Sequence, residues 1–227
     1  MKIIHREDLH QGGFAGLKET RMVMDAKAWG QQVEPGVQPG LGQFVYLADA
    51  RFIPHGETKM HPHHEIDVIS VMVEGRIAHQ GSLEHGQELN AFDVQVQRAG
   101  GEGFRHNEVN PDDVENRMLQ LWFLPEVAGE PAGYRVYHPQ AGERLRVYGG
   151  DEGQDETFAA KTVMEVARLN AGDQLEQDSE FIAYITTGSG QANGESVGEG
   201  DLLSGDALSL TANEDSLVVL VHQGAAG

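Results

Sequence analysis

The chain carries VMVEGRIAHQG at residues 71–81 and YITTGSGQANG at residues 184–194, and the two stretches align without a gap. In each stretch an apolar run ends at a glycine, Gly75 or Gly188, and a second glycine follows six positions later. Self-similarity of this kind is typical of one structural unit used twice. The sequence therefore predicts two similar halves.

Short β-type runs fill much of the remaining chain. The run FDVQVQ at residues 92–97 places Phe92, Val94 and Val96 on one face and polar side chains on the other, which predicts a half-buried strand. The run 157–169 fits a helix as well, but its Thr and Val residues favour a strand. The other β-rich runs lie between turn residues, at 43–52, 67–73, 118–124, 181–187, 207–211 and 216–222. We expect an all-β protein, built as a sandwich or barrel, with little helix.

A segment rich in Pro and Gly separates the two halves. It reads PEVAGEPAG at residues 125–133 and lacks any periodicity, which is typical of a linker. We place the boundary near Glu130, so that residues 1–130 form an N-terminal domain and residues 131–227 a C-terminal one.

Composition excludes several classes of partner and chemistry. With 16 Lys and Arg against 36 Asp and Glu, the net charge is −20, which disfavours binding to nucleic acid or to an anionic membrane. No run approaches the roughly 20 apolar residues of a membrane helix. The absence of cysteine excludes disulfides and zinc sites built on sulfur. The N-terminus lacks the apolar stretch of a signal peptide, so we expect a cytoplasmic protein.

Histidines carry the clearest chemical signal. In the run HPHH at residues 61–64, an extended backbone projects His61 and His63 from the same face, and Pro62 favours that extended form. His64 then points to the opposite face, toward solvent or into an outer role. His79 and His85, beside the turn after Gly75, are expected at the surface.

A second pair of candidate ligands follows 45 residues after His61. His106 and Glu108 are separated by one residue, so an extended strand directs both side chains to one face. A β-barrel can bring this pair beside His61 and His63. Three imidazoles and one carboxylate suit iron, manganese, nickel, copper or zinc, with coordination positions left for water or substrate.

The second half lacks this ligand set. The offsets that relate His61 and His63 to Gly75 lead, from Gly188, to Gln174 and Glu176. We therefore expect a metal in the N-terminal half and none in the C-terminal half.

These stretches resemble the pirin-like bicupins, which hold two cupin β-barrels in one chain. The resemblance covers most of residues 56–126 and rests on HPH, VISVMVEG, FDVQ and AGGEGFRHNE. The second cupin motif, Gly-x-x-His-x-x-x-Asn, is matched by Gly103, His106 and Asn110. The resemblance implies a bicupin fold, one divalent metal held by residues matching His61, His63, His106 and Glu108, and a degenerate, metal-free C-terminal barrel. It makes iron the first choice of metal.

The resemblance also implies a function. Bacterial members similar to this chain are quercetin 2,3-dioxygenases, which implies an oxidoreductase acting on a flavonol or related small aromatic, with Glu108 as the base that takes the substrate hydroxyl proton. Other pirins resemble redox-responsive regulators, so a non-enzymatic metal sensor acting through a protein partner is the alternative. Another small-molecule cupin reaction, such as an isomerisation, is a third interpretation.

Two departures from the family pattern bear on the substrate. The family usually shows an Arg-Gly-Phe-Glu type sequence where this chain has HEID at residues 64–67, and a Thr or Ser where it has Arg98. We expect both changes near the mouth of the pocket, where they would leave the four ligands intact.

Overall fold

The computed structural model describes residues 1–83 and 87–224. Strands dominate it, as the sequence predicts, and its only α-helix within these ranges is the short α1 (Ala26–Trp29), beside two 3-10 turns, η1 (Arg6–Asp8) and η2 (Gly30–Gln32). Within these ranges, no helix has the length and apolar character needed to cross a membrane. The chain divides into two compact units, Leu9–His138 and Met1–Asp8 with Pro139–Gly227.

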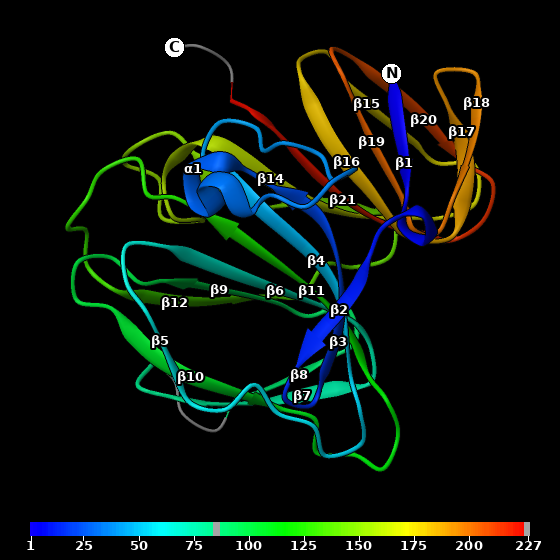
Figure 1. Ribbon diagram of the computed structural model, residues 1–227. Coiled ribbons are helices and arrows are strands. Elements are labelled where there is room, and N and C mark those ends of the chain that lie inside the picture. The colour runs from blue at the N-terminus through cyan, green and yellow to red at the C-terminus, as the bar shows by residue number, and fades with distance from the viewer. Residues whose placement is uncertain (84–86, 225–227) are drawn as a thin grey trace. The chain divides into compact units, whose positions relative to one another are not determined.

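The N-terminal unit, Leu9–His138, is built from two antiparallel sheets that face each other (Figure 1). The larger sheet has the order β12-β9-β6-β11-β4-β3-β2, and the smaller one has the order β5-β10-β7-β8. The strands are β2 (Gln11–Phe14), β3 (Leu17–Met24), β4 (Phe44–Phe52), β5 (His61–His63), β6 (Asp67–Glu74), β7 (Arg76–Gly81), β8 (Glu88–Asn90), β9 (Val94–Arg98), β10 (Phe104–Val109), β11 (Arg117–Phe123) and β12 (Gly133–Tyr137).

The C-terminal unit is also built from two antiparallel sheets. Their orders are β1-β19-β16-β21-β14-β13 and β15-β20-β17-β18. The strands are β1 (Lys2–His5), β13 (Glu143–Gly150), β14 (Ala160–Leu169), β15 (Gln174–Gln177), β16 (Phe181–Thr187), β17 (Ser189–Ala192), β18 (Glu195–Gly198), β19 (Asp201–Gly205), β20 (Leu208–Ala212) and β21 (Ser216–Gln223). The ambiguous run 157–169 forms β14, which confirms the strand interpretation.

The internal repeat is confirmed in the strand order. The order β9-β6-β11-β4-β3 of one unit matches β19-β16-β21-β14-β13 of the other, and β5-β10-β7-β8 matches β15-β20-β17-β18. Gly75 and Gly188 occupy the same turn in the two units, with φ of 72° and 87°, a conformation that favours glycine. Of the second glycines, Gly194 has φ of 87°, whereas Gly81 lies within β7, so only the first pair is equivalent in conformation.

Edge strands decide where the two compact units divide. Strand β12 pairs with β9, which extends the N-terminal unit to His138, and β1 pairs with β19, which assigns the first eight residues to the C-terminal unit. The sequence pattern carries no signal of either pairing. The boundary near Glu130 remains a prediction of where independent domains would separate.

The run 92–97 differs from its prediction. Phe92 lies in a turn with φ of 76°, and the strand β9 begins only at Val94. Both faces of this strand are buried, and Gln95 and Gln97 have no solvent exposure. The prediction of a half-buried strand is therefore wrong. The polar face of β9 lies inside the N-terminal unit, where Gln97 forms hydrogen bonds with His79 and His106.

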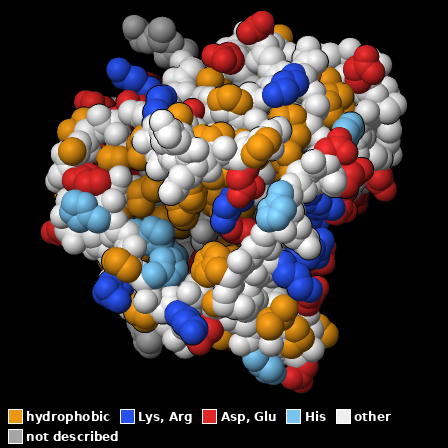
Figure 2. All heavy atoms as spheres, viewed as in Figure 1, with side chains coloured by type: hydrophobic (Ala, Val, Ile, Leu, Met, Phe, Trp, Pro, Cys, Tyr) orange, Lys and Arg blue, Asp and Glu red, His pale blue; other side chains and the backbone are white. Residues whose placement is uncertain are grey.

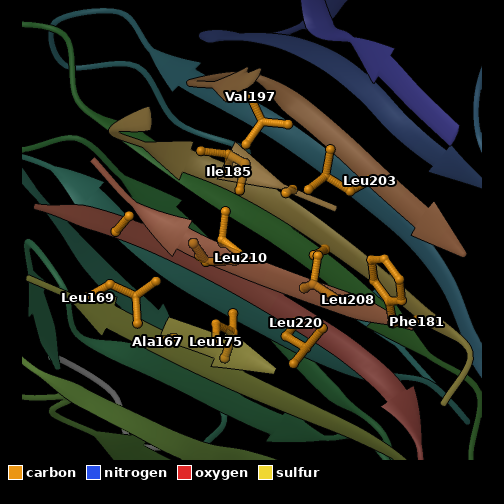
Figure 3. Packing of buried hydrophobic residues seen from close by; sticks show 14 residues of the cluster. Ala167, Leu169, Leu175, Phe181, Ile185, Val197, Leu203, Leu208, Leu210 and Leu220 are labelled. Atoms are coloured by element: carbon orange, nitrogen blue, oxygen red, sulfur yellow. The ribbon is translucent and has the colours of Figure 1, made fainter. Parts of the chain in front are cut away.

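An apolar cluster fills the C-terminal unit (Figure 3). Its side chains come from both sheets and alternate along each strand, as in Leu208 and Leu210 of β20. The cluster consists of Ala167, Leu169, Leu175, Phe181, Ala183, Ile185, Ala192, Val197, Leu203, Leu208, Leu210, Ala212, Val218 and Leu220.

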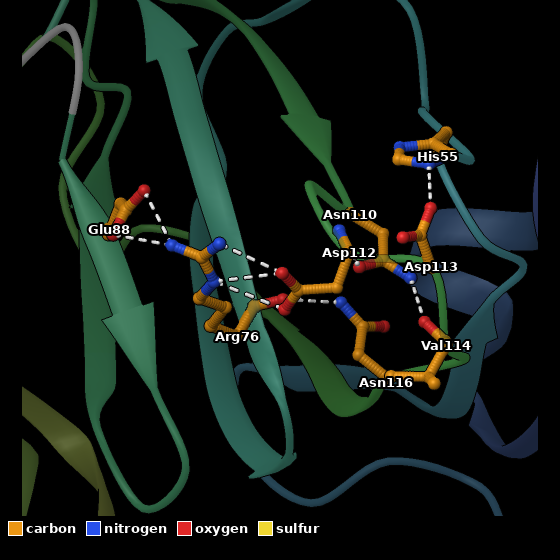
Figure 4. A network of polar contacts seen from close by, with 8 residues as sticks. All are labelled: His55, Arg76, Glu88, Asn110, Asp112, Asp113, Val114 and Asn116. Atoms are coloured by element: carbon orange, nitrogen blue, oxygen red, sulfur yellow. Dashed lines mark hydrogen bonds and ion pairs between the residues drawn. The ribbon is translucent and has the colours of Figure 1, made fainter.

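The motif residue Asn110 holds the loop that joins β10 to β11 (Figure 4). Its side-chain amide donates to the backbone oxygens of Phe52, Ile53 and Val114, and its Oδ1 accepts from the backbone N–H of Asp112. Asp112 in turn pairs with Arg76 at 2.8 Å. The asparagine of the second motif is therefore a structural residue that fixes the end of the strand carrying His106.

Candidate metal centre

Three histidine side chains meet in the N-terminal unit. His61 and His63 lie on β5 and His106 on the neighbouring strand β10, where it pairs directly with His61. The Nε2 atom of His106 lies 3.0 Å from Nε2 of His61 and 3.1 Å from Nε2 of His63. The ligand atoms of all three lie within 4.8 Å of one another. The structure thus brings together two stretches that are 45 residues apart in the chain.

Hydrogen bonds on the far side of two rings determine their tautomers. Nδ1 of His61 lies 2.8 Å from the backbone oxygen of Lys59, and Nδ1 of His106 lies 3.0 Å from Oε1 of Gln97. Because these oxygens only accept, each Nδ1 carries the proton and each Nε2 presents a lone pair. The 3.0 Å distance between Nε2 of His61 and Nε2 of His106 therefore brings two lone pairs together, an arrangement that a cation between them stabilises.

The charge state and spacing of the imidazoles also suit a metal ion. Burial lowers the pKa of His63 to about 4, and burial with the neighbouring histidines lowers the pKa of His106 to about 2, so both are neutral near pH 7. Neutral imidazole is the form that binds metals. With metal–nitrogen distances of about 2.1 Å, nitrogens about 90° apart would be separated by about 3.0 Å. The distances from His106 to His61 and to His63 therefore fit neighbouring positions around one ion.

Glu108 lies on the same strand as His106, two residues on, and is fully buried. Its Oε1 accepts a hydrogen bond from Ser70 Oγ at 2.9 Å, and its Oε2 accepts one from Gln120 Nε2 at 3.0 Å. Burial raises the pKa of Glu108 to about 7, although both hydrogen bonds act to lower it. The carboxylate is not part of the three-histidine group, so its ligation of a metal remains a prediction.

A buried polar lining surrounds these residues, and the sequence reading missed it. It includes Ser70 of β6, Gln95 and Gln97 of β9, and His79 of β7. His79 is 1 % exposed, so its expected surface position is wrong; His85 lies outside the described residues. The only sequence signal was the polar face of 92–97, which carries two uncharged glutamines.

The C-terminal unit replaces this lining with apolar side chains. Ser70, five residues before Gly75, corresponds to Ala183, five residues before Gly188. The strand registers then match three further pairs, which are His79 with Ala192, Gln95 with Leu203 and Gln120 with Leu220. All four C-terminal residues belong to the apolar cluster in Figure 3. At these four positions the N-terminal unit is therefore polar and the C-terminal unit apolar, although a separate apolar cluster that includes Phe52, Met72 and Met118 also lies in the N-terminal unit.

The residues that depart from the family pattern follow site residues in the chain, His64 after His63 and Arg98 after Gln97. His64 is exposed, and its Nε2 lies 3.1 Å from the backbone oxygen of Gly101. This agrees with the prediction that His64 points away from the face of His61 and His63. Arg98 pairs across the strands with Asp67 and contacts Glu130 at 2.9 Å. Asp67, at the end of the altered stretch 64–67, and Arg98 thus form an ion pair between neighbouring strands. The sequence did not indicate this structural role.

Aromatic side chains lie on one side of the histidines. The ring of Trp122 lies 5.9 Å from that of His63 and 4.5 Å from that of Tyr46. Trp29, from α1, stacks on Trp122 with an angle of 8° between the ring planes. On the face drawn in Figure 2, histidine side chains lie next to one another beside a band of hydrophobic side chains. Broad apolar ring faces near the centre suit a flat aromatic ligand.

Comparison with known proteins places this site in a family. The family model described as Pirin matches residues 22–123. A Pseudomonas aeruginosa protein with the provisional name quercetin 2,3-dioxygenase PA1210 is 35 % identical over 175 residues, which cover 71 % of this chain and 75 % of that protein. The Escherichia coli K12 protein named quercetin 2,3-dioxygenase is 25 % identical over 170 residues, covering 70 % and 73 %.

Solved structures show the same fold. The crystal structure of the bacterial pirin YhhW of Escherichia coli, in complex with nickel(II), superposes with a TM-score of 0.83 over 99 % of both chains, at 19 % identity. A quercetin 2,3-dioxygenase from Acinetobacter baumannii gives a TM-score of 0.69 over 99 % of this chain and 86 % of that chain, at 16 % identity. With its bicupin fold and its sequence similarity to these relatives, the chain belongs to the pirin family.

Proposed function

We propose that this protein is a metal-dependent dioxygenase of the quercetin 2,3-dioxygenase type, acting on a flavonol or a related small aromatic. The observation that carries the proposal is the convergence of three imidazole Nε2 atoms, those of His61, His63 and His106, in a unit that also holds the buried carboxylate of Glu108 on the strand of His106. The names of the relatives in Pseudomonas and Escherichia support the reaction type.

In this proposal His61, His63 and His106 hold one divalent metal ion. Glu108 is the proposed fourth ligand, which requires its carboxylate to turn from Ser70 or Gln120. Iron is the first choice, and manganese, nickel, copper and zinc also suit nitrogen and oxygen ligands. When bound, the metal supplies a Lewis acid that makes a coordinated hydroxyl group more acidic.

Glu108 is also the proposed base. A carboxyl group with a pKa of about 7 both accepts and releases a proton near neutral pH. One carboxylate oxygen accepts a hydrogen bond from Ser70 and the other accepts one from Gln120, and each keeps a second lone pair that can receive the 3-hydroxyl proton of the flavonol. The two donors orient the carboxylate, while the partly exposed ring of Trp122, 5.9 Å from that of His63, offers an apolar surface for the substrate.

A direct assay tests the proposal. The purified protein is loaded with each candidate metal in turn and incubated with quercetin, and the loss of quercetin absorbance is recorded together with the consumption of dioxygen. We expect metal-dependent turnover that His61→Ala abolishes. We expect Glu108→Gln to lower kcat far more than it weakens quercetin binding, because it removes the base and retains the shape of the side chain.

His64→Ala is the matched control, since it removes a neighbouring exposed imidazole that faces away from the centre. It should leave turnover unchanged. Undiminished turnover in Glu108→Gln would refute the role of the base. Stoichiometric metal without turnover of quercetin, whatever the metal, would refute the dioxygenase and favour the metal sensor instead.

A further inference from the structure

A continuous chain of buried hydrogen bonds leads from Tyr134 to the metal centre. The Tyr134 hydroxyl donates to Gln95 Oε1 at 2.9 Å, and Gln95 Nε2 donates to Gln97 Oε1 at 2.9 Å. The same Oε1 accepts from Nδ1 of His106 at 3.0 Å, while Gln97 Nε2 donates to Nε2 of His79 at 3.1 Å. Gln95, Gln97 and His106 have no solvent exposure.

The direction of this chain determines the tautomer of His106. A carboxamide accepts at one end and donates at the other, so rotating Gln97 by half a turn would present its NH₂ group to His106. Nδ1 of His106 would then accept, and the ring proton would lie on Nε2, facing His61 and His63. A ring in that state cannot bind a metal through Nε2. The orientation of one amide thus decides whether His106 is a ligand.

The neighbours of Gln97 support only one orientation. If Gln97 alone were rotated, its NH₂ group would face the NH₂ group of Gln95, and its oxygen would face the lone pair of His79 Nε2. The contact between the two NH₂ groups would be repulsive between side chains that have no solvent exposure, and the contact with His79 would be repulsive unless the ring proton of His79 moved to Nε2. Gln95 would then have to rotate as well and the Tyr134 hydroxyl would have to change from donor to acceptor, so reversal requires at least three side chains to change together.

We propose that Gln97 is a positioning residue that keeps the Nε2 lone pair of His106 directed at the metal, with its own orientation coupled through Gln95 to the Tyr134 hydroxyl. The proposal rests on the metal site of the proposed function but not on the reaction catalysed there. A second observation supports it: in the C-terminal unit, the register equivalents of Gln95 and Gln97 are Leu203 and Gly205. The barrel without the histidines also lacks the chain that would orient them.

Two substitutions of Gln97 separate positioning from packing. Gln97→Met keeps the volume but removes the acceptor, whereas Gln97→Glu keeps an acceptor for His106 Nδ1 and adds a buried charge. If Gln97 positions His106, Gln97→Met should weaken Ni²⁺ binding about 10- to 100-fold, and Gln97→Glu should bind at least as tightly as the natural protein. If Gln97 only fills space, the order reverses, because the apolar side chain fits and the charge does not.

The affinities are measured by titration calorimetry with Ni²⁺ on protein whose folding is checked by circular dichroism. A second measurement keeps the proposal testable if a Gln97 variant does not fold. In metal-free protein, imidazole ¹⁵N shifts should show the His106 proton on Nδ1, and Tyr134→Phe should introduce the Nε2–H form and weaken Ni²⁺ binding by less than about tenfold. Thr186→Val in the C-terminal unit, which removes a buried hydroxyl, is the control and should change neither.

Equal Ni²⁺ affinity in Gln97→Met and the natural protein would overturn the proposal, as would a metal-free His106 that carries its proton on Nε2. Neither result depends on quercetin turnover. A protein that binds nickel in the expected order of variants yet does not turn over quercetin would refute the dioxygenase and leave the role of Gln97 intact.

Discussion

Glu108→Gln should stabilise the metal-free protein at neutral pH, and in the metal-loaded protein it should abolish the proposed turnover. The glutamine can keep both contacts of the natural side chain, since its oxygen can accept from Gln120 and its NH₂ group can donate to the Ser70 hydroxyl. It differs from the glutamate mainly in that it never becomes charged. The substitution therefore isolates the cost of holding a carboxylate in a fully buried place.

The magnitude follows from the raised pKa of Glu108. Its value rises from 4.5 to about 7 on folding, and each pH unit corresponds to about 1.36 kcal/mol, so the folded state favours the protonated form by about 3 kcal/mol. Because the folded protein holds this proton more tightly than the unfolded chain, the contribution is present below pH 4.5. It is lost as the pH rises from 4.5 through about 7.

Urea unfolding of metal-free protein, from pH 5 to pH 8, measures the difference. The free energy of unfolding of the natural protein should fall relative to that of Glu108→Gln across this range, by about 2–3 kcal/mol in total. Ser70→Ala is a useful companion, because it removes one donor to the carboxylate and should raise the pKa of Glu108 further. A pH-independent difference between the natural protein and Glu108→Gln would refute the reasoning.

Three further predictions test the surroundings of the site. Gly103→Ala should lower the free energy of unfolding by about 1–2 kcal/mol, because φ at this position is +73°. It should also weaken Ni²⁺ binding in calorimetry, because a Cβ there would lie 2.8 Å from the backbone oxygen of His63. The control Gly172→Ala, where φ is +89° and the space is open, should lower stability but leave Ni²⁺ binding unchanged. Asp49→Ala should lower the free energy of unfolding in urea by about 3–5 kcal/mol, because it leaves the fully buried Arg117 without its bidentate partner; a loss below 1 kcal/mol would contradict this. His64→Ala should leave the metal content unchanged in elemental analysis, since its ring faces Gly101, and a lower content would show that it acts on the centre.

Much of the fold and the core of the site were predictable because their signals are local. The runs 181–187 and 216–222 are short, apolar and bounded by turn residues, which indicates strands whatever surrounds them, and the turn at Gly75 and Gly188 favours glycine because φ is positive. The HPH spacing likewise directs His61 and His63 to one face before any partner strand is known. His106 lies 45 residues after His61 in the chain, and the pairing of β10 with β5 brings it beside the other two histidines.

The rest depended on which faces the closed barrel turns inward. Gln95 and Gln97 alternate with valines as the exposed face of an edge strand would, so their pattern alone predicted contact with solvent. The orientation of Glu108 toward Ser70 and Gln120, rather than toward the histidines, depends on strands β6 and β11, which come from distant parts of the chain. Edge pairing by β1 and β12 carried no local signal either.

The sequence by itself determined that this protein is a duplicated all-β chain and that its histidines gather in one half, because strand periodicity, turn glycines and ligand spacing are properties of neighbouring residues. Only the tertiary structure decided that the polar face of β9 is an interior that orients His106. The physical reason is that a side chain meets water or protein according to the sheet packed opposite it, and in this protein that sheet is supplied by β5, β7 and β10.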